Sequence, residues 1–242
     1  MKKKVLFVVT SHDKKGDTGQ PTGYYLPEVS HPWQVLKNAG YEIDFVSPKG
    51  GKPPAEGVDL SDAANKAFVE DAVYQDKINH SMTPKQVNPA DYEAIYFAGG
   101  HGTMWDFPDN AGLAALAVNI YEKGGAVSAV CHGPAGLVNA RLSDGKYLVE
   151  GKRVSAFTNE EEMSVKLDQV VPFLLESKLI ERGAILEKVG LWQEKVVTDG
   201  RLVTGQNPAS AKGVGEALLQ VLQTPDLTAL AGITYPLSAT VV

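Results

Sequence analysis

Cysteine is nearly absent from this sequence: Cys131 is the only one among 242 residues. A lone cysteine cannot form an internal disulfide, so the reducing cytoplasm is the expected location. The sequence also has no apolar run long enough to span a membrane, and residues 1–10 have too short an apolar run for a signal peptide. We therefore expect neither a disulfide scaffold nor a membrane partner.

A large excess of one charge is missing as well. The chain has 29 acidic and 23 basic residues, which are mixed along its length and give a formal net charge of −6. This balance disfavours nucleic acid or an anionic membrane as the main partner. Because 43% of the residues are hydrophobic, a chain of this length can bury one sizeable core. The sequence predicts a single domain over residues 1–242 that acts on a small molecule.

Several motifs of cofactor-binding and catalytic proteins are absent too. No phosphate-binding loop, no dinucleotide-binding glycine fingerprint and no Gly-x-Ser-x-Gly elbow occurs. His12, His31, His80 and His101 could form a metal site with Glu28, but none of them has a tight ligand spacing such as His-x-x-x-His. The sequence therefore predicts no cofactor and no metal.

Short β-branched and aromatic runs alternate with helical patterns along the chain. Strands are predicted over residues 5–10, 41–47, 94–98, 126–130 and 153–157, and helices over residues 32–39, 113–123, 170–182 and 210–223. The strand segments show little polar alternation, which is typical of a parallel sheet covered by helices on both faces. The order of the elements predicts a doubly wound α/β fold.

Two segments depart from this pattern. Asp199-Gly200 lies between two alternating runs in residues 195–205, which predicts an antiparallel hairpin near the C-terminus. Residues 51–90 are rich in Lys, Pro, Asp and Asn, and we expect them to form an insertion or a lid over a pocket.

Cys131 lies where an apolar strand meets a glycine-rich turn with the sequence Cys-His-Gly-Pro-Ala-Gly. An isolated cysteine is commonly an inert core residue. A nucleophile, in contrast, gains from a sharp bend that exposes the thiol, and from a neighbouring imidazole and a helix start that lower its pKa. We therefore interpret Cys131 as a catalytic nucleophile with an exposed thiol of lowered pKa.

A second glycine turn, Gly-Gly-His-Gly at residues 99–102, closes the preceding predicted strand. The ends of neighbouring parallel strands meet in one crevice, so this turn is expected beside the cysteine. The backbone amides of Gly100 and His132 could then form an oxyanion hole, with Gly99 and His101 against the substrate. The alternative is that the glycines only permit a tight turn.

Carboxylates at two places could assist the thiol. Glu28 precedes a predicted helix and could be solvated in its first turn, or it could lie beside the thiol in a partly dry pocket with a raised pKa. Glu160, Glu161 and Glu162 could form a solvated helix start, or one of them could orient His132 as the acid of a Cys-His-acid triad. The residues alone leave these alternatives open.

These motifs together resemble the ThiJ/PfpI superfamily, which shares its fold with class I glutamine amidotransferases. The resemblance rests on Ala-Val-Cys-His-Gly-Pro at residues 129–134, on the Gly-Gly-His-Gly turn, on Glu28 before a His-Pro helix start, and on residues 198–210. Within the superfamily, the chain looks most like the branch of glyoxalase III enzymes and heat-shock chaperones.

The resemblance implies a flavodoxin-like domain, a homodimer and a set of site roles. Cys131 matches the nucleophile, Glu28 the acid that contacts it, and His132 the histidine of the triad. Glu162 is the triad carboxylate favoured by counting forward from Phe157, with its two acidic neighbours as competitors.

The implied activity is a cofactor-independent conversion of methylglyoxal and water to lactate through a hemithioacetal on Cys131. Three alternatives accompany it. The same residues could serve a cysteine-dependent amidase or peptidase, or an isonitrile hydratase. From another class, the chain could be a stress-response holdase chaperone in which the cysteine senses oxidation.

Overall fold

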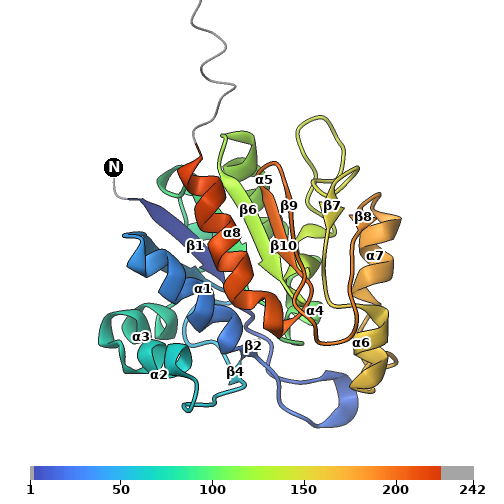
Figure 1. The fold of residues 1–242 in the computed structure, drawn as a ribbon, viewed down its shortest axis with the longest axis horizontal. Helices are drawn as coiled ribbons and strands as arrows, with labels where there is room; N and C mark the ends of the chain where they lie inside the picture. The colour runs from blue at the N-terminus through green and yellow to red at the C-terminus, as the bar shows by residue number, and fades with distance from the viewer. Residues whose placement is uncertain (1–2, 225–242) are drawn as a thin grey trace, which may run out of the picture.

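The computed structural model describes residues 3–224, and a six-stranded sheet forms its centre (Figure 1). The strand order is β3-β1-β5-β6-β10-β9, and neighbours are parallel except for β9, which is antiparallel to β10. The predicted mostly parallel fold and its C-terminal hairpin are therefore confirmed. The strands are β1 (Lys4–Val8), β3 (Glu42–Val46), β5 (Ala94–Phe97), β6 (Ala126–Val130), β9 (Val196–Asp199) and β10 (Leu202–Gly205).

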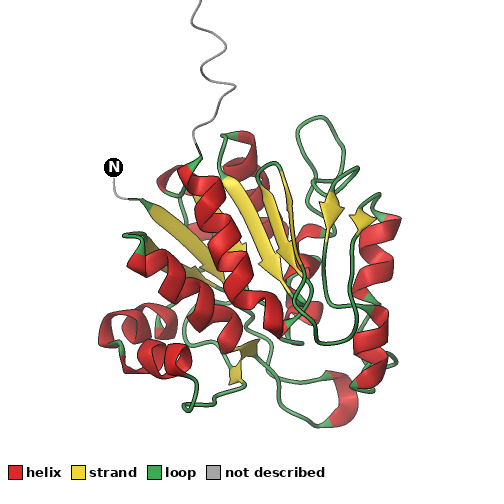
Figure 2. Cartoon of the chain, viewed as in Figure 1, coloured by secondary structure: helices red, strands yellow, loops and turns green. Residues whose placement is uncertain are grey.

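Helices cover both faces of the sheet (Figure 2). On one face, α1 (Pro27–Asn38) packs against α8 (Ala211–Gln223), and α8 contacts β6 and β10. On the other face, α5 (Ala111–Glu122) contacts β5 and β6 together with a 3-10 helix at Gly133–Leu137. The doubly wound arrangement therefore follows the predicted alternation of strands and helices.

The first strand explains why both faces are covered. Val5 and Phe7 belong to the apolar cluster under α1 and α8, whereas Leu6 and Val8 belong to the cluster under α5. Successive side chains of a strand point to opposite faces, so an uninterrupted apolar run must be buried on both sides. All four of these side chains are fully buried.

The remaining elements lie around the sheet, and several gather at the carboxyl ends of its strands. In Figure 1 the arrow of β6 points toward the side where β2, β4 and α6 lie. The full set of remaining elements is β2 (Tyr24–Tyr25), β4 (Ala55–Glu56), α2 (Ala63–Glu70), α3 (Ala72–Asn79), α4 (Thr103–Asp106), β7 (Arg153–Val154), α6 (Asn159–Ser164), α7 (Leu175–Glu181), β8 (Ile185–Leu186) and 3-10 helices at Gly16–Thr18, Pro84–Gln86, Pro89–Asp91 and Pro208–Ser210.

The first helix begins earlier than predicted, at Pro27 instead of residue 32. Pro32 lies inside α1, where its ring nitrogen has no hydrogen to donate to the carbonyl of Glu28 one turn earlier. The hydroxyl of Tyr96 donates to that carbonyl instead, at 2.5 Å. This replacement lets the helix start upstream of an internal proline, and it puts Glu28 in the first helical turn.

Two other predicted elements are shorter than expected. Of residues 153–157 only Arg153–Val154 form a strand, which pairs with β8 in a separate two-stranded sheet. The helix predicted over residues 170–182 is limited to Leu175–Glu181. Pro172 lies in residues 170–174, which were predicted to be helical but are not, and a proline inside a helix removes a helical hydrogen bond.

Residues 51–90 divide into two parts. Ala55–Glu56 pair with β2, whereas α2 and α3 pack around α1 and β3. The predicted role of this segment as an insertion or lid stays a prediction. Within residues 3–224, no helix is long and apolar enough to cross a membrane.

Candidate active site

Cys131 occupies a sharp bend directly after β6. Its backbone φ is +58°, a left-handed conformation that non-glycine residues rarely adopt. The Cys131 amide donates to the carbonyl of Gly205, and the Cys131 carbonyl accepts from the amide of Phe157. These two bonds fix the strained residue from both sides. A strained residue between a strand and a helical turn is the geometry of a nucleophile elbow.

The thiol at this bend is buried, in contrast to the predicted exposure. Cys131 is 4% exposed, and its Sγ lies 3.4 Å from Nδ1 of His132. Burial raises the pKa of the thiol well above its usual value, and the nearby Glu28 raises it further. The amide of His132 opposes this shift but does not outweigh it. The predicted lowering of the thiol pKa was therefore wrong, because loss of water outweighs the amide dipole.

Glu28 faces the same cavity and is fully buried. It lies in the first turn of α1 and not before the helix as predicted, because α1 begins at Pro27, and the solvated alternative is wrong. Burial raises the pKa of Glu28 to about 8. The Cys131 thiol and the Gly99 amide oppose this shift, although neither makes a geometrically complete hydrogen bond to the carboxyl. At neutral pH the carboxyl is therefore mostly protonated and available as a proton donor.

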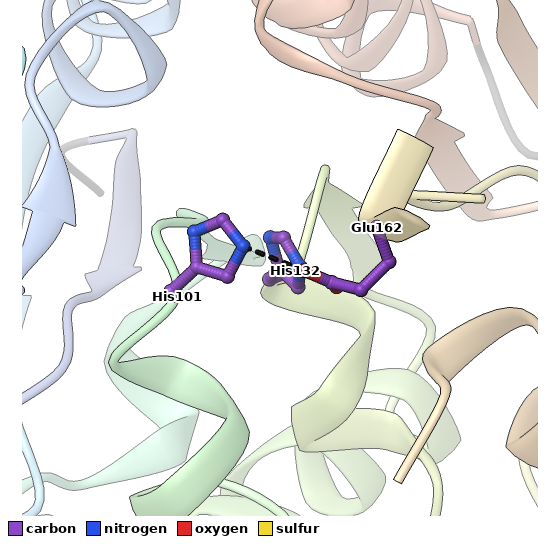
Figure 3. Close-up of side chains that lie close together, drawn as sticks. All are labelled: His101, His132 and Glu162. Carbon is purple, nitrogen blue, oxygen red and sulfur yellow. Dashed lines mark hydrogen bonds and ion pairs between the residues drawn. The ribbon is translucent and has the colours of Figure 1, made fainter. Parts of the chain in front are cut away.

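Glu162 joins two imidazoles (Figure 3). Its Oε2 lies 2.7 Å from Nε2 of His132, and its Oε1 lies 2.8 Å from Nε2 of His101. Burial acts to raise the pKa of Glu162, but the two imidazoles lower it to about 2. The pKa of His101 is lowered by its own burial and by the neighbouring His132. The arrangement is a buried carboxylate that accepts from both rings.

The three consecutive glutamates at the start of α6 have separate environments. Glu160 is exposed and pairs with Lys188 at 3.6 Å. Glu161 is fully buried and forms a capping box with Thr158. Glu162 alone of the three bonds to an imidazole among the described residues. Consecutive residues of a helix point about 100° apart, so one position of the run reaches the histidines.

Gly99 and Gly100 let other groups approach the cysteine. A Cβ atom at position 99 would overlap the Glu28 carboxyl and lie 2.9 Å from Cβ of Cys131. Gly100 has a φ of +106°, and a Cβ atom there would lie 2.8 Å from the amide nitrogen of Tyr25. Gly100 lines the cavity together with His101 and His132, whereas Gly99 lies beneath Glu28 and is not part of the cavity wall.

The cavity in front of the thiol has a volume of about 310 Å³. At its mouth the ammonium of Lys15 pairs with the carboxylate of Glu56 at 2.8 Å. Sequence reasoning missed Lys15, Tyr25, Glu56 and Trp192, because loops distant in sequence bring them here. The lining residues are Lys15, Tyr25, Glu28, Glu56, Gly57, Gly100, His101, Cys131, His132, Phe157, Val165, Trp192 and Pro208.

A larger cavity of about 650 Å³ lies elsewhere, at the opposite end of β5 and β6 beside Glu93, Ala126 and Arg201. It contains no cysteine or histidine among its lining residues. The larger cavity therefore lacks the thiol and the imidazoles that line the smaller one.

The described residues bring three potential metal ligands together. One ligand atom each from His101, His132 and Glu162 lies within 4.8 Å of the others. Both histidines bond to the Glu162 carboxylate through Nε2. The histidine set considered from the sequence does not assemble, since His31 bonds to Asp62 and His12 stacks on a tryptophan.

Comparisons with known proteins agree with this geometry. The DJ-1/PfpI family matches residues 22–221. A protein of Saccharomyces cerevisiae named glutathione-independent glyoxalase HSP31 is 36% identical over 91% of this chain and 98% of its own length. Glyoxalase 3 of Candida albicans is 33% identical over 91% of this chain and 98% of its own.

Solved structures give the same result. The Rapid Encystment Protein 24 KDa of Francisella tularensis has a TM-score of 0.88 and 40% identity, covering 92% of this chain and 100% of that one. Glyoxalase III of Candida albicans has a TM-score of 0.84 and 30% identity, covering 90% of this chain and 97% of that one. The resemblance inferred from the motifs is confirmed, and the chain belongs to the DJ-1/PfpI family.

Proposed function

We propose that this protein is a glutathione-independent glyoxalase that converts methylglyoxal and water to lactate, with Cys131 as the nucleophile. The names of its relatives support the reaction class. The observation that carries the proposal is the chain of contacts from the Cys131 sulfur through His132 to Glu162. Cys131 and His132 line a cavity together with Glu28.

The first step follows from the raised pKa of the thiol. Because Cys131 holds its proton at neutral pH, the proton must leave as the sulfur attacks. Nδ1 of His132 accepts it, while Nε2–H of the same ring donates to Glu162. Glu162 stabilises the imidazolium because its own pKa of about 2 keeps it ionised.

The sulfur then bonds to the aldehyde carbon of methylglyoxal, and the carbonyl electron pair moves to oxygen. That oxygen takes a proton and becomes the hydroxyl of a hemithioacetal. We assign the backbone amides of Gly100 and His132 to the developing oxyanion. The His132 amide supports this role because it lies close enough to Sγ to act on the thiol pKa.

Glu28 and His132 are the groups that move protons in the next step. Removal of the proton from the former aldehyde carbon and protonation of the ketone oxygen give an enediol. Protonation of the second carbon and loss of the first hydroxyl proton give a lactoyl thioester. Water then displaces the sulfur, which releases lactate and regenerates the thiol. Glu28 suits this exchange because a carboxyl with a pKa of about 8 can donate and accept near neutral pH.

The test is lactate formation from methylglyoxal without glutathione, compared in one assay series with glutamine, small peptides and an isonitrile. The proposal expects lactate as the main product. If an amide or an isonitrile were turned over and no lactate formed, the protein would instead be a hydrolase or a hydratase that uses the same Cys-His-acid set.

Three further parts of the proposal concern the whole protein. We expect a homodimer, as the family resemblance implies, and light scattering of the purified chain measures it. The lone cysteine supports a location in the cytoplasm. The holdase alternative predicts protection of an aggregating client by Cys131→Ala, and the enzyme proposal does not require it.

A further inference from the structure

Trp192 has a backbone conformation that its side chain does not explain. Its φ is +62°, and among the described residues only Cys131 and Lys166 share a positive φ without being glycine. Bulky residues avoid this region, so the surrounding structure must impose it. Yet the residue is 46% exposed, and burial of the indole in a core cannot supply that reason.

The backbone at position 192 is held by a buried carboxylate. The Trp192 amide donates to Oε1 of Glu161 at 3.0 Å. The same oxygen accepts from Gln206 at 3.0 Å and from Asn207 at 2.8 Å. The amide of Asn207 also donates to the carbonyl of Gln193 at 2.8 Å. Because the side chains of Glu161, Gln206 and Asn207 are fully buried, this hydrogen-bond network holds the loop firmly.

The fixed loop directs the indole to the catalytic cavity. Trp192 lines the cavity, and its ring meets the ring of Phe157 edge-on, with centroids 5.7 Å apart. The ring of Phe157 lies 4.2 Å from that of His132. Phe157 and Trp192 therefore form an aromatic wall beside the proposed base, and the partly exposed Val165 also lines the cavity.

The size and charge of the cavity indicate what this wall contacts. A volume of about 310 Å³ falls in the range of about 300–1,000 Å³ for pockets that hold drug-sized ligands, far more than a three-carbon dicarbonyl fills. Lys15 and Glu56 pair with each other at the mouth, so neither offers a free charge to a charged substituent. The remaining space is suited to a neutral, apolar group.

We propose that Trp192 is a specificity-determining residue and that the site favours neutral α-ketoaldehydes with an aromatic or bulky apolar substituent over methylglyoxal. This inference rests on the proposed glyoxalase function and names its substrate class. The indole stacks on the substituent, while the dicarbonyl reaches the thiol. Glu161 is a positioning residue that holds Trp192 in place.

The test compares kcat/KM for phenylglyoxal and for methylglyoxal in the wild type, Trp192→Ala and Leu191→Ala. Leu191 is a matched control, because it is 43% exposed in the same loop and does not line the cavity. The phenylglyoxal-to-methylglyoxal ratio should fall about tenfold in Trp192→Ala, the loss expected for one aromatic contact. It should stay unchanged in Leu191→Ala.

A second variant separates specificity from folding. Trp192→Gly removes the indole and also relieves the positive φ, so its melting temperature should be no lower than that of Trp192→Ala while the ratio falls equally. An equal loss for both substrates, or the same fall in Leu191→Ala, would overturn the inference and leave the glyoxalase function intact. A wild-type protein that converts neither substrate would overturn both.

Discussion

Gly99 packs directly against the carboxyl of Glu28. A Cβ atom at position 99 would overlap Oε2 of that carboxyl and crowd the Cβ of Cys131. The absence of a side chain at one position therefore lets a buried acid reach the thiol.

Gly99→Ala should displace the Glu28 carboxyl and lower kcat with methylglyoxal by about tenfold or more, because a misplaced proton donor loses its geometry. Gly124→Ala is the control: its φ of +91° adds backbone strain that position 99 does not have, but nothing lies within 4 Å of the added methyl, so it tests the effect of an added methyl group away from the site. Gly124→Ala should lose about 1 kcal/mol of stability and keep its kcat. Equal kcat values in the two variants would contradict this role of Gly99.

The raised pKa of Glu28 predicts a pH-dependent stability. Between its ordinary value of 4.5 and about 8, the folded protein keeps a proton that the unfolded chain has released. The stabilisation is complete below pH 4.5 and is lost as the pH rises through 8. The Glu28→Gln side chain cannot titrate. The free energy of unfolding of the wild type, measured with urea, should therefore fall by a few kcal/mol relative to that of this variant between pH 4.5 and 8.5. If the difference in unfolding free energy between the two proteins stayed constant over this pH range, the Glu28 carboxyl would not be buried in its neutral form.

Glu162 should matter for both activity and acid stability. Glu162→Gln removes the charge that stabilises the His132 imidazolium, so kcat should fall on the order of a hundredfold. The exposed Glu160 gives the control Glu160→Gln, which should keep full activity.

The lowered pKa of Glu162 gives the opposite pH dependence to Glu28. Its stabilisation is present above pH 4.5 and is lost as the pH falls through about 2. The free energy of unfolding of the wild type should fall by roughly 3 kcal/mol relative to that of Glu162→Gln as the pH is lowered from 4.5 to below 2. An unchanged difference between pH 5 and pH 2 would show that the imidazoles do not stabilise the carboxylate.

Chelation should leave the activity intact. The proposed steps use protein groups and water, and His101 and His132, which lie close enough to Glu162 to bind a metal with it, both bond to its carboxylate. Acid–base catalysis by protein groups does not need a metal. Dialysis against EDTA should therefore change the rate of lactate formation by less than about twofold. Loss of activity that zinc restores would contradict this expectation.

The sequence predicted the sheet well because its strands are short apolar runs buried on both faces. It placed the glycine turn and Cys131 at neighbouring strand ends, which follows from parallel topology alone. It missed the true start of α1, because Pro32 read as a helix start while the hydroxyl of Tyr96 satisfies the carbonyl that the proline leaves free.

The electrostatics of the site could not be predicted in the same way. The direction of the Cys131 pKa depends on how closely β2, β4 and the loop with Trp192 cover the thiol, and these contacts join residues far apart in the sequence. The Trp192 backbone amide likewise shares one buried carboxyl oxygen of Glu161 with the side-chain amides of Gln206 and Asn207, a pattern with no local sequence signal.

The most direct test of the central claim is the rate of lactate formation from methylglyoxal by wild type and Cys131→Ala, with no glutathione present. The variant should keep its circular dichroism spectrum and lose activity by about a thousandfold or more, because no other group supplies the attacking atom. A folded Cys131→Ala protein that makes lactate at the wild-type rate would contradict the mechanism.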